Sequence, residues 1–398
     1  MGSVYVHFPY CLAKCPYCDF TSYASPRDRI DHAGYADAVL AELRGRARSL
    51  AGRARELRVA TVFFGGGTPS LWEPAELGRV LEGVRATFSC APELEVTVEC
   101  NPTSLDAARA QALRDVGVGR LSIGSQSLDA EELRFLGRLH DPAGALAAVR
   151  AALGVSGLRV STDLIFGLPG QAPETAAAQA TALADLGLQH VSAYQLTIEA
   201  GTRFGELAKV GRLPLADDGR VAEAFLAVDE ALVARGFEHY EISNFARPGE
   251  RARHNEGYWR GDEYLGLGCG AVGALERDDG RAATRYRNPV SPADYMLRAT
   301  AFGDAPTTGL DGEGLSLEVE SLPPETRLKE RIMLGLRLAE GFDLDAAAAE
   351  VGAEGFTPER ERAIARSVAR GRLMREGTRL SIPRAAWLFT DDTAARLF

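Results

Sequence analysis

The sequence lacks the features of membrane and secreted proteins. No apolar run approaches the ~18 residues that a membrane-spanning helix needs. The first residues, MGSVYVHFPYC, contain neither the basic region nor the apolar region of a signal peptide. Lysine is scarce: of the 45 lysine and arginine side chains, only Lys14, Lys209 and Lys329 are lysines. The net charge of −10 disfavours a nucleic-acid partner, since such proteins present a basic face.

Cysteine is also sparse, and its placement is uneven. Three of the six cysteines, Cys11, Cys15 and Cys18, fall within eight residues. A secreted disulfide framework is short and rich in cysteine, and this chain of 398 residues is neither. We therefore expect a cytoplasmic protein whose clustered thiols serve metal or redox chemistry. The scattered cysteines are Cys90, Cys100 and Cys269.

The first half of the chain alternates between patterns of strands and helices. Six such repeats with short connections predict parallel strands, either in an open partial barrel or in a doubly wound sheet. Ser104, Asp129 and Asp141 are candidate helix caps. The expected strands are Val4–Phe8, Val59–Phe64, Leu94–Glu99, Leu121–Ile123, Leu158–Phe166 and Val191–Ile198. The expected helices are Tyr35–Leu50, Ala75–Phe88, Leu105–Val116, Ala130–Leu136, Ala143–Leu153 and Thr175–Leu186.

The pattern changes after this α/β region, which we place at residues 1–235. Residues 236–305 form a segment rich in glycine and aromatics, within which Phe245 to Asp279 is expected to be irregular. Residues 306–324 are polar, with glycines and a proline pair, which is typical of a linker. Residues 325–398 then predict two helices and a hairpin, the order of a small winged-helix-like α+β module.

The spacing Cys11-x-x-x-Cys15-x-x-Cys18 follows the first strand directly. Clustered thiolates select iron–sulfur clusters, zinc or Cu(I). A structural zinc site needs four ligands, usually as two pairs, and no second pair is present. Three cysteines can instead hold three irons of a [4Fe–4S] cluster and leave the fourth iron open. The alternative is a chance grouping of three free thiols.

The segment YVHFPYCLAKCPYCDF, with Tyr17 just before the last cysteine, resembles the signature of the radical S-adenosylmethionine (SAM) superfamily. It is most similar to the oxygen-independent coproporphyrinogen III oxidase-like branch, and the resemblance covers essentially the whole chain. It implies a partial (β/α)6 barrel, a [4Fe–4S] cluster on Cys11, Cys15 and Cys18, and SAM on the open iron. One electron would then cleave the cofactor to a 5′-deoxyadenosyl radical.

The resemblance also implies contacts to SAM at successive strand ends. GGGTP after the second strand would meet its amino group, and Glu99 in ECNP would hold its ribose. Taken alone, the glycines would predict a tight turn, and a single strand-end carboxylate would predict a helix cap or a surface ion pair. Gln195 and Thr197 occupy similar places with weaker support. The implied SAM residues are Tyr5, Tyr17, Gly66, Gly67, Thr68, Glu99, Gln126, Arg138 and Asp163.

Two segments separate this chain from the oxidases of the branch. The oxidases carry a fourth cysteine two residues after the third, where this chain has Phe20. The run His254 to Trp259 fits the HNxxYW motif of the related heme chaperones. His254 is thus a possible heme ligand, because imidazole can bind heme iron axially. The alternative is that His254 bonds the backbone while Tyr258 and Trp259 pack between domains.

Other candidates for heme ligation are weaker. Many relatives have cysteine where Ala252 stands and histidine where Val272 stands, so this chain would need a different second ligand. His7 is expected to support the cluster rather than to bind heme, and Cys269 is a conceivable ligand or a buried thiol.

We therefore expect a protein that binds a [4Fe–4S] cluster, SAM and heme, and that transfers heme to an apo-hemoprotein client. The client could itself be membrane-associated, and the cluster would require an electron donor. The alternative is a radical SAM enzyme that acts on a porphyrinogen, because the implied SAM residues form a full set. Phe20 favours the chaperone.

Overall fold

A computed structural model describes residues 2–51, 53, 56–278, 280–305, 309 and 312–398. Its centre is a 12-stranded sheet in the order β14-β13-β12-β11-β1-β4-β5-β6-β7-β8-β10-β9. The six consecutive strands from β1 to β8 in this order are parallel, as predicted, and are buried over most of their length. They are β1 (Gly2–Phe8), β4 (Val59–Gly66), β5 (Cys90–Cys100), β6 (Arg120–Gln126), β7 (Arg159–Phe166) and β8 (His190–Gln195).

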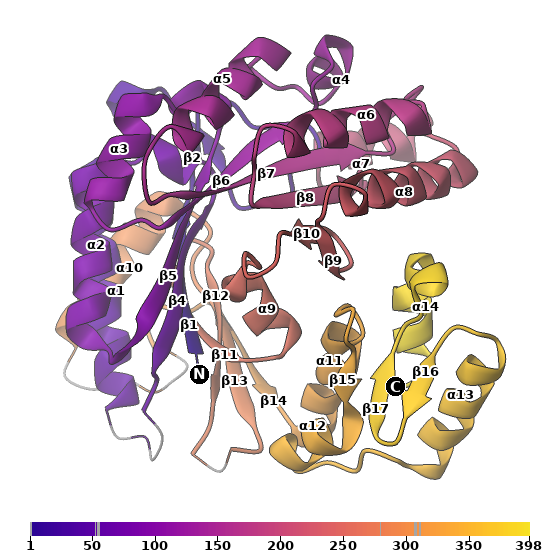
Figure 1. Cartoon of the computed structure of the whole chain (residues 1–398). Helices are drawn as coiled ribbons and strands as arrows, with labels where there is room; N and C mark the ends of the chain where they lie inside the picture. Colours follow the sequence, from indigo (N-terminus) through magenta and orange to yellow (C-terminus); the bar gives the residue numbers. More distant parts are fainter. Residues whose placement is uncertain (1, 52, 54–55, 279, 306–308, 310–311) are drawn as a thin grey trace.

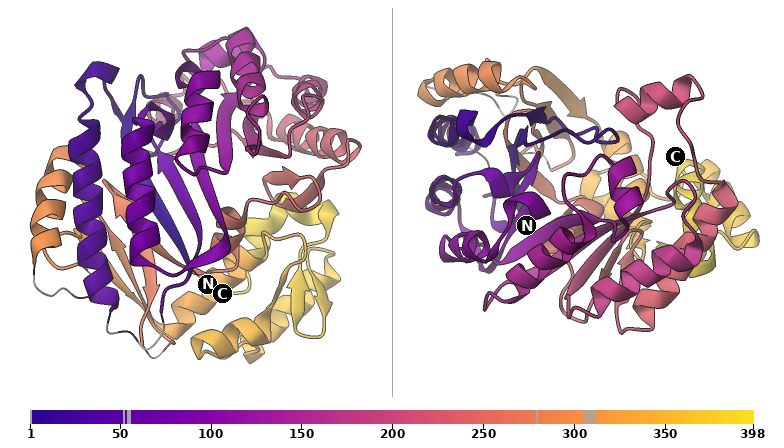
Figure 2. Two further views of the ribbon diagram at one scale, coloured as in Figure 1. Left: turned by 60° about the vertical axis from the view of Figure 1, so that its left-hand side comes forward. Right: turned by 90° about the horizontal axis from the view of Figure 1, so that it is seen from above.

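Helices that connect these strands cover the outer face of the curved sheet, and the other face looks toward the C-terminal part of the chain (Figures 1 and 2). This is the predicted (β/α)6 arrangement. Asp129 and Asp141 cap helices as expected, but the helix after Ser104 is capped by Asp106, whose carboxylate accepts from the Arg109 N–H at 2.7 Å. The helices are α1 (His32–Leu50), α2 (Pro74–Thr87), α3 (Ala107–Asp115), α4 (Ala130–Phe135), α5 (Pro142–Leu153), α6 (Pro173–Ala184), α7 (Arg203–Lys209) and α8 (Asp218–Val233).

The segment expected to be irregular is largely ordered, so that prediction was wrong. It contains α9 (Arg253–Trp259), β11 (Glu263–Gly268) and β12 (Val272–Glu276), and β11 pairs with β1 in parallel. The sequence did not reveal these strands because glycine weakens a strand pattern. Glycine is needed at Gly266 and Gly273, since a Cβ atom there would collide with Val272 and Tyr286, respectively. The neighbouring elements are β9 (Glu238–Glu241), β10 (Asn244–Ala246), β13 (Ala283–Arg287) and α10 (Pro292–Asp304).

The expected linker and C-terminal helices are only partly as predicted. Residues 306–308 and 310–311 lie outside the described residues, and β14 (Glu318–Leu322) extends the main sheet by pairing with β13. The C-terminal module, residues 324–398, has its own hydrophobic core. Its two predicted helices and its hairpin are present, while α12, α14 and β15 were not predicted. Its elements are α11 (Pro324–Gly335), β15 (Phe342–Asp343), α12 (Leu344–Val351), α13 (Pro358–Ala369), β16 (Met374–Glu376), β17 (Arg379–Ser381) and α14 (Thr390–Ala395).

No helix among the described residues is long and apolar enough to cross a membrane.

A buried carboxylate joins α1 to the added strands. Glu42 is fully buried and accepts hydrogen bonds from the Gly268 N–H at 2.9 Å, the Asn288 amide at 2.7 Å and the Tyr295 hydroxyl at 2.8 Å. The Arg46 guanidinium lies 3.4 Å from the same carboxylate. Because every one of these donors is itself enclosed, the group cannot be removed without leaving several of them unsatisfied.

We expect Glu42→Ala to lower the free energy of unfolding by roughly 3–5 kcal/mol, since it breaks a buried ion pair and removes the acceptor of the Gly268, Asn288 and Tyr295 donors. Urea denaturation followed by circular dichroism measures this loss. The control is Glu320→Ala, which removes an exposed partner of Arg285 and should cost at most ~1 kcal/mol. Equal effects of the two substitutions would contradict the role of Glu42.

Candidate functional site

The three clustered cysteines lie in one loop directly after β1. Cys11 belongs to the short strand β2 (Tyr10–Cys11), and the Cys18 N–H donates to the Cys15 carbonyl at 3.2 Å. All three side chains are half-buried and none forms a disulfide. Burial raises the pKa of the Cys11 and Cys18 thiols. We call residues 11–18 the cysteine loop.

The glycines of the GGGTP segment allow β4 to end against the cysteine loop. The Gly67 N–H donates to the Phe8 carbonyl at 2.7 Å, and the Thr68 N–H donates to the Tyr10 carbonyl at 2.9 Å. A Cβ atom on Gly67 would lie 2.7 Å from the Tyr10 oxygen, so only glycine fits. Gly66 has a φ of +108°, and the Thr68 hydroxyl donates to the Cys11 sulfur at 3.3 Å. The segment therefore holds the cysteine loop at the strand ends.

Two carboxyl groups are enclosed beside this junction. Glu99 at the end of β5 accepts from the Gly66 N–H at 3.0 Å, and Asp163 lies in β7, two strands away. Burial and the neighbouring Asp163 raise the pKa of Glu99 to about 8. Burial likewise raises the pKa of Asp163 to about 6, against an opposing effect of Arg138. A positively charged ligand would stabilise both carboxylates.

Gln126 and Arg138 complete the wall next to the cysteines. Gln126, at the end of β6, has a φ of +67° and is the one non-glycine residue of the described chain with a positive φ. Such strain is most often found at functional sites. Arg138 donates to the Gly124 carbonyl at 2.7 Å and to the Cys15 sulfur at 3.5 Å. Its buried Nε has no partner among the described residues, so it can still donate to a bound group.

Tyr5 and His7 connect the strands to Thr21, just after the cysteine loop. The Nε2 of His7 donates to the Thr21 carbonyl at 2.7 Å, because a carbonyl can only accept. Its Nδ1 therefore accepts from the Tyr5 hydroxyl, 3.0 Å away. Both nitrogens of His7 are occupied, which agrees with its expected supporting position.

A cleft of about 730 Å³ opens at these strand ends, a size within the range of small-molecule sites. Seven of the predicted residues line this central cleft: Tyr17, Cys18, Glu99, Gln126, Asp163, Gln195 and Thr197. Gly66 adjoins it through its hydrogen bond to Glu99, whereas Tyr5, Gly67, Thr68 and Arg138 are not among the residues that line it. The opposite wall comes from the C-terminal module, which the sequence did not indicate. Its lining residues include Tyr17, Cys18, Phe20, Glu99, Gln126, Asp163, Ile165, Phe166, Tyr194, Gln195, Leu196, Thr197, Phe225, Arg337, Trp387, Leu388 and Asp391.

The cysteine loop suits an iron–sulfur cluster better than a single ion. No group of three or more His, Cys, Asp or Glu side chains converges on one point in the described part of the chain. In a cluster each cysteine binds a different iron, so the thiolates need not converge. The Nε of Arg138, which has no partner among the described residues, can donate to a bound group, and the buried carboxyls of Glu99 and Asp163 favour a cationic ligand beside it.

His254 and Cys269 lie away from the central cleft. His254 is 2% exposed, with Nδ1 2.7 Å from the Thr61 hydroxyl and Nε2 3.2 Å from the Tyr258 hydroxyl. Its ring stacks on Phe63 at 4.8 Å. In this conformation neither nitrogen is available to a heme, so the arrangement supports the alternative role in packing. Cys269 is buried and donates to the Val290 carbonyl at 2.9 Å.

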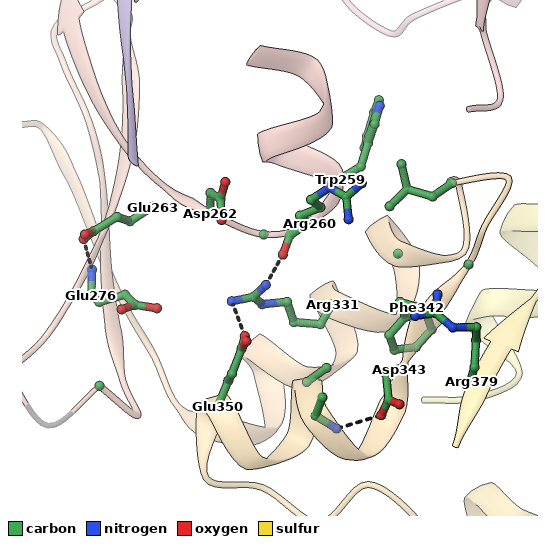
Figure 3. Close-up of a pocket in the computed structure, with 17 residues that line it drawn as sticks. Trp259, Arg260, Asp262, Glu263, Glu276, Arg331, Phe342, Asp343, Glu350 and Arg379 are labelled. Atoms are coloured by element: carbon green, nitrogen blue, oxygen red, sulfur yellow. Dashed lines mark hydrogen bonds and ion pairs between the residues drawn. The ribbon is translucent and has the colours of Figure 1, made fainter. Parts of the chain in front are cut away.

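A second pocket, of about 550 Å³, lies between α9, β11 and the C-terminal module (Figure 3). Arg331 pairs with Glu350 at 3.1 Å and donates to the Arg260 carbonyl. Trp259 of the HNxxYW segment lies at its edge. Because Arg331 joins the C-terminal module to the Arg260 carbonyl, we assign the pocket to the interface between the two parts of the chain.

Comparisons with known proteins agree with this geometry. A family model of the Radical SAM superfamily matches residues 5–183, and one of the HemN C-terminal domain matches residues 322–389. The chain is 39% identical over 289 residues to "Heme chaperone HemW" of Escherichia coli K12, covering 72% of this chain and 74% of that protein. It is 36% identical over 395 residues to "Heme chaperone HemW" of Mycobacterium tuberculosis H37Rv, covering 99% and 94%.

Among solved structures, the coproporphyrinogen III oxidase HemN of E. coli superposes with a TM-score of 0.79 over 100% of this chain and 89% of that one. At 20% sequence identity this likeness concerns the fold alone. The match to the Radical SAM family model implies a [4Fe–4S] cluster and SAM. The sequence relatives indicate the subgroup within the superfamily. The chain belongs to the HemW family within the radical SAM superfamily.

Proposed function

We propose that the chain is a heme chaperone that binds a [4Fe–4S] cluster, SAM and heme, and delivers the heme to apo-hemoproteins. The observation that carries the proposal is that the cysteine loop and the buried carboxyls of Glu99 and Asp163 adjoin one cleft. Relatives named heme chaperones, at 36–39% identity, support heme as the cargo. The protein would act in the cytoplasm without binding nucleic acid.

Each group at the strand ends has a defined task in this proposal. Cys11, Cys15 and Cys18 hold three irons, and when bound the cluster supplies one electron to the sulfonium of SAM. Glu99 and Asp163 accept hydrogen bonds from the cofactor and balance its positive charge. The other residues proposed to contact SAM are Tyr5, Tyr17, Gly66, Gly67, Thr68, Gln126 and Arg138.

Phe20 supports a chaperone over an oxidase. It lines the central cleft with 57% of its surface exposed, at the position where the oxidases have a fourth cysteine. The second candidate is a radical SAM enzyme that acts on a porphyrinogen, which the full set of cofactor residues favours. Either function needs an electron donor, and the chaperone also needs an apo-hemoprotein client, including one held at a membrane.

Replacing Cys11, Cys15 and Cys18 together by Ser should abolish retention of iron and sulfide after anaerobic reconstitution, because serine does not replace thiolate as an iron ligand. Iron, sulfide and zinc analysis checks this. Cys90→Ser, outside the cysteine loop, is the control and should keep the cluster. One tightly held zinc without iron in the unmodified chain would overturn the proposal.

Glu99→Gln should weaken SAM binding by about tenfold or more, since charge-assisted hydrogen bonds contribute ~1.5–3 kcal/mol. The cofactor is cationic and prefers the carboxylate, whose pKa is about 8 in the free protein. Below that pH, binding must displace a proton from Glu99, so the affinity of the unmodified chain should rise from pH 7 to 9.

Calorimetry on the reconstituted protein measures both effects. The SAM affinity of the unmodified chain should rise more steeply with pH than that of Glu99→Gln. In the variant, only the cofactor and groups other than residue 99 still titrate. Glu131→Gln is the control, because Glu131 is exposed on α4. Equal affinity of Glu99→Gln and the unmodified chain would show that Glu99 does not contact SAM.

The reconstituted protein should bind heme at about one equivalent and leave coproporphyrinogen III unconverted, because it lacks the fourth cysteine. Heme titration and product analysis in parallel check this. Stoichiometric decarboxylation with consumption of SAM would favour the second candidate instead.

A further inference from the structure

The inner face of β1 and β4 carries aromatic side chains that do not line the central cleft. Side chains alternate between the two faces of a strand, and Val4, Val6 and Phe8 of β1 point into the core beneath the helices. Tyr5 therefore points to the opposite face, and Phe63 is its partner in the register of β4. Helix α9, which carries the HNxxYW segment, packs against β1 and β4 on the side of the sheet away from α1 and α2 (Figure 1).

Four rings form a continuous series of contacts along this face. The Phe63 ring stacks with His254 at 4.8 Å and with Tyr5 at 6.2 Å. The Tyr5 ring meets His7 edge-on at 5.9 Å, and its hydroxyl donates to the same imidazole at 3.0 Å. The three ring separations lie in the range of about 4.5–7 Å over which aromatic rings attract each other. We call His254, Phe63, Tyr5 and His7 the ring column.

The His254 end of the column is fixed by its surroundings. The two imidazole nitrogens lie 2.7 Å from the Thr61 hydroxyl and 3.2 Å from the Tyr258 hydroxyl. The His254 main-chain N–H donates to the buried carboxylate of Glu95 at 3.2 Å. The Tyr258 ring in turn meets Tyr264 of β11 edge-on at 4.8 Å. The ring at this end therefore cannot turn without breaking several contacts.

The His7 end of the column meets the chain just after the cysteine loop. Nε2 of His7 donates to the carbonyl of Thr21 at 2.7 Å, three residues after Cys18. A Cβ atom on Gly270 would lie 2.7 Å from the Thr21 side chain, so Thr21 is held between His7 and Gly270. The position of His7 thus helps to determine where the chain leaves the cysteine loop.

The same imidazole supports the turn at the end of β4. A Cβ atom on Gly66 would lie 2.4 Å from Cε1 of His7, so the ring is in direct contact with the Gly66 backbone. The Gly66 N–H donates at 3.0 Å to Glu99, the carboxyl proposed to bind SAM. A displacement of His7 would therefore move both Gly66 and its hydrogen bond to Glu99.

Hydrogen bonds at both ends distinguish the column from side chains that only fill space. Each of the two histidines has a partner at both of its ring nitrogens, which fixes the orientation of the imidazole as well as its position. Rings that only filled the interior could be apolar throughout, and their orientation would not need to be fixed.

We propose that Phe63 and His254 are positioning residues for the cluster and SAM site. Through Tyr5 they hold His7 in the place where it contacts both Gly66 and Thr21. This inference rests on the proposed function and extends it to two side chains that lie outside the central cleft. The HNxxYW segment is thereby linked to the residues that hold the cysteine loop.

The test measures SAM binding and the cluster spectrum of the reconstituted full chain. Phe63→Leu removes the middle ring and should weaken SAM binding by roughly threefold to tenfold, the size of a lost aromatic contact. The electron paramagnetic resonance signal of the reduced, SAM-bound cluster should also shift, because Gly66 and Thr21 are held less firmly. His254→Leu should change both in the same direction. The double variant should bind SAM no more weakly than Phe63→Leu, because that substitution already interrupts the column.

Phe237→Leu is the matched control. Phe237 is a buried phenylalanine just before β9, at one edge of the main sheet, and its ring lies 4.6 Å from the Arg247 guanidinium. Its substitution should lower the thermal midpoint as a core substitution does, but leave the SAM affinity within about twofold and the resonance signal unchanged.

Unchanged SAM affinity and signal in folded Phe63→Leu, or additive losses in the double variant, would overturn the inference and leave the proposed function standing. If Phe63→Leu does not fold, Phe63→Met, which keeps more of the side-chain volume, takes its place in the test. If the unmodified chain binds neither cluster nor SAM, the proposed function fails as well.

Discussion

The close approach between the end of β4 and the cysteine loop is the constraint on which the site depends. Main-chain hydrogen bonds from Gly67 and Thr68 to the carbonyls of Phe8 and Tyr10 join two chain segments nearly sixty residues apart. A side chain at Gly67 would push them apart. The same turn presents the Gly66 N–H to Glu99, so one backbone geometry positions both the thiols and the carboxyl. The proposed cluster and SAM sites thus depend on the same two glycines, Gly66 and Gly67.

Burial then determines which ligand this site favours. Glu99 and Asp163 are enclosed, and burial raises the pKa of both carboxyl groups, so their charged forms are disfavoured. A cationic cofactor would relieve that cost, whereas an anionic one would increase it.

Local sequence signals predicted the repeating core well. Buried β-branched runs marked all six parallel strands, and Asp129 and Asp141 marked the starts of their helices. The family resemblance named the cysteine loop and the strand-end residues in advance, and parallel strands bring such residues to one edge of the sheet. The glycine-rich strands β11 and β12 were not predicted, because glycine weakens the alternating pattern by which a strand is recognised in a sequence.

The wall of the cleft opposite the strand ends could not have been predicted in this way. Tyr194, Arg337 and Trp387 come from distant parts of the chain and meet only through docking of the C-terminal module. The surroundings of His254 could not be predicted for a related reason. A histidine beside aromatics suits a heme ligand by residue type, but its burial against Thr61 and Phe63 follows from tertiary packing alone.

The central claim is that the chain hands heme to a client. The most direct measurement is the rate at which heme leaves the loaded, reconstituted protein for an apo-hemoprotein from the same cell, compared with its release into excess apomyoglobin as a passive scavenger. Our account predicts a transfer rate that rises with client concentration and exceeds passive release, because the two proteins contact each other. A transfer rate equal to passive release at every client concentration would contradict it.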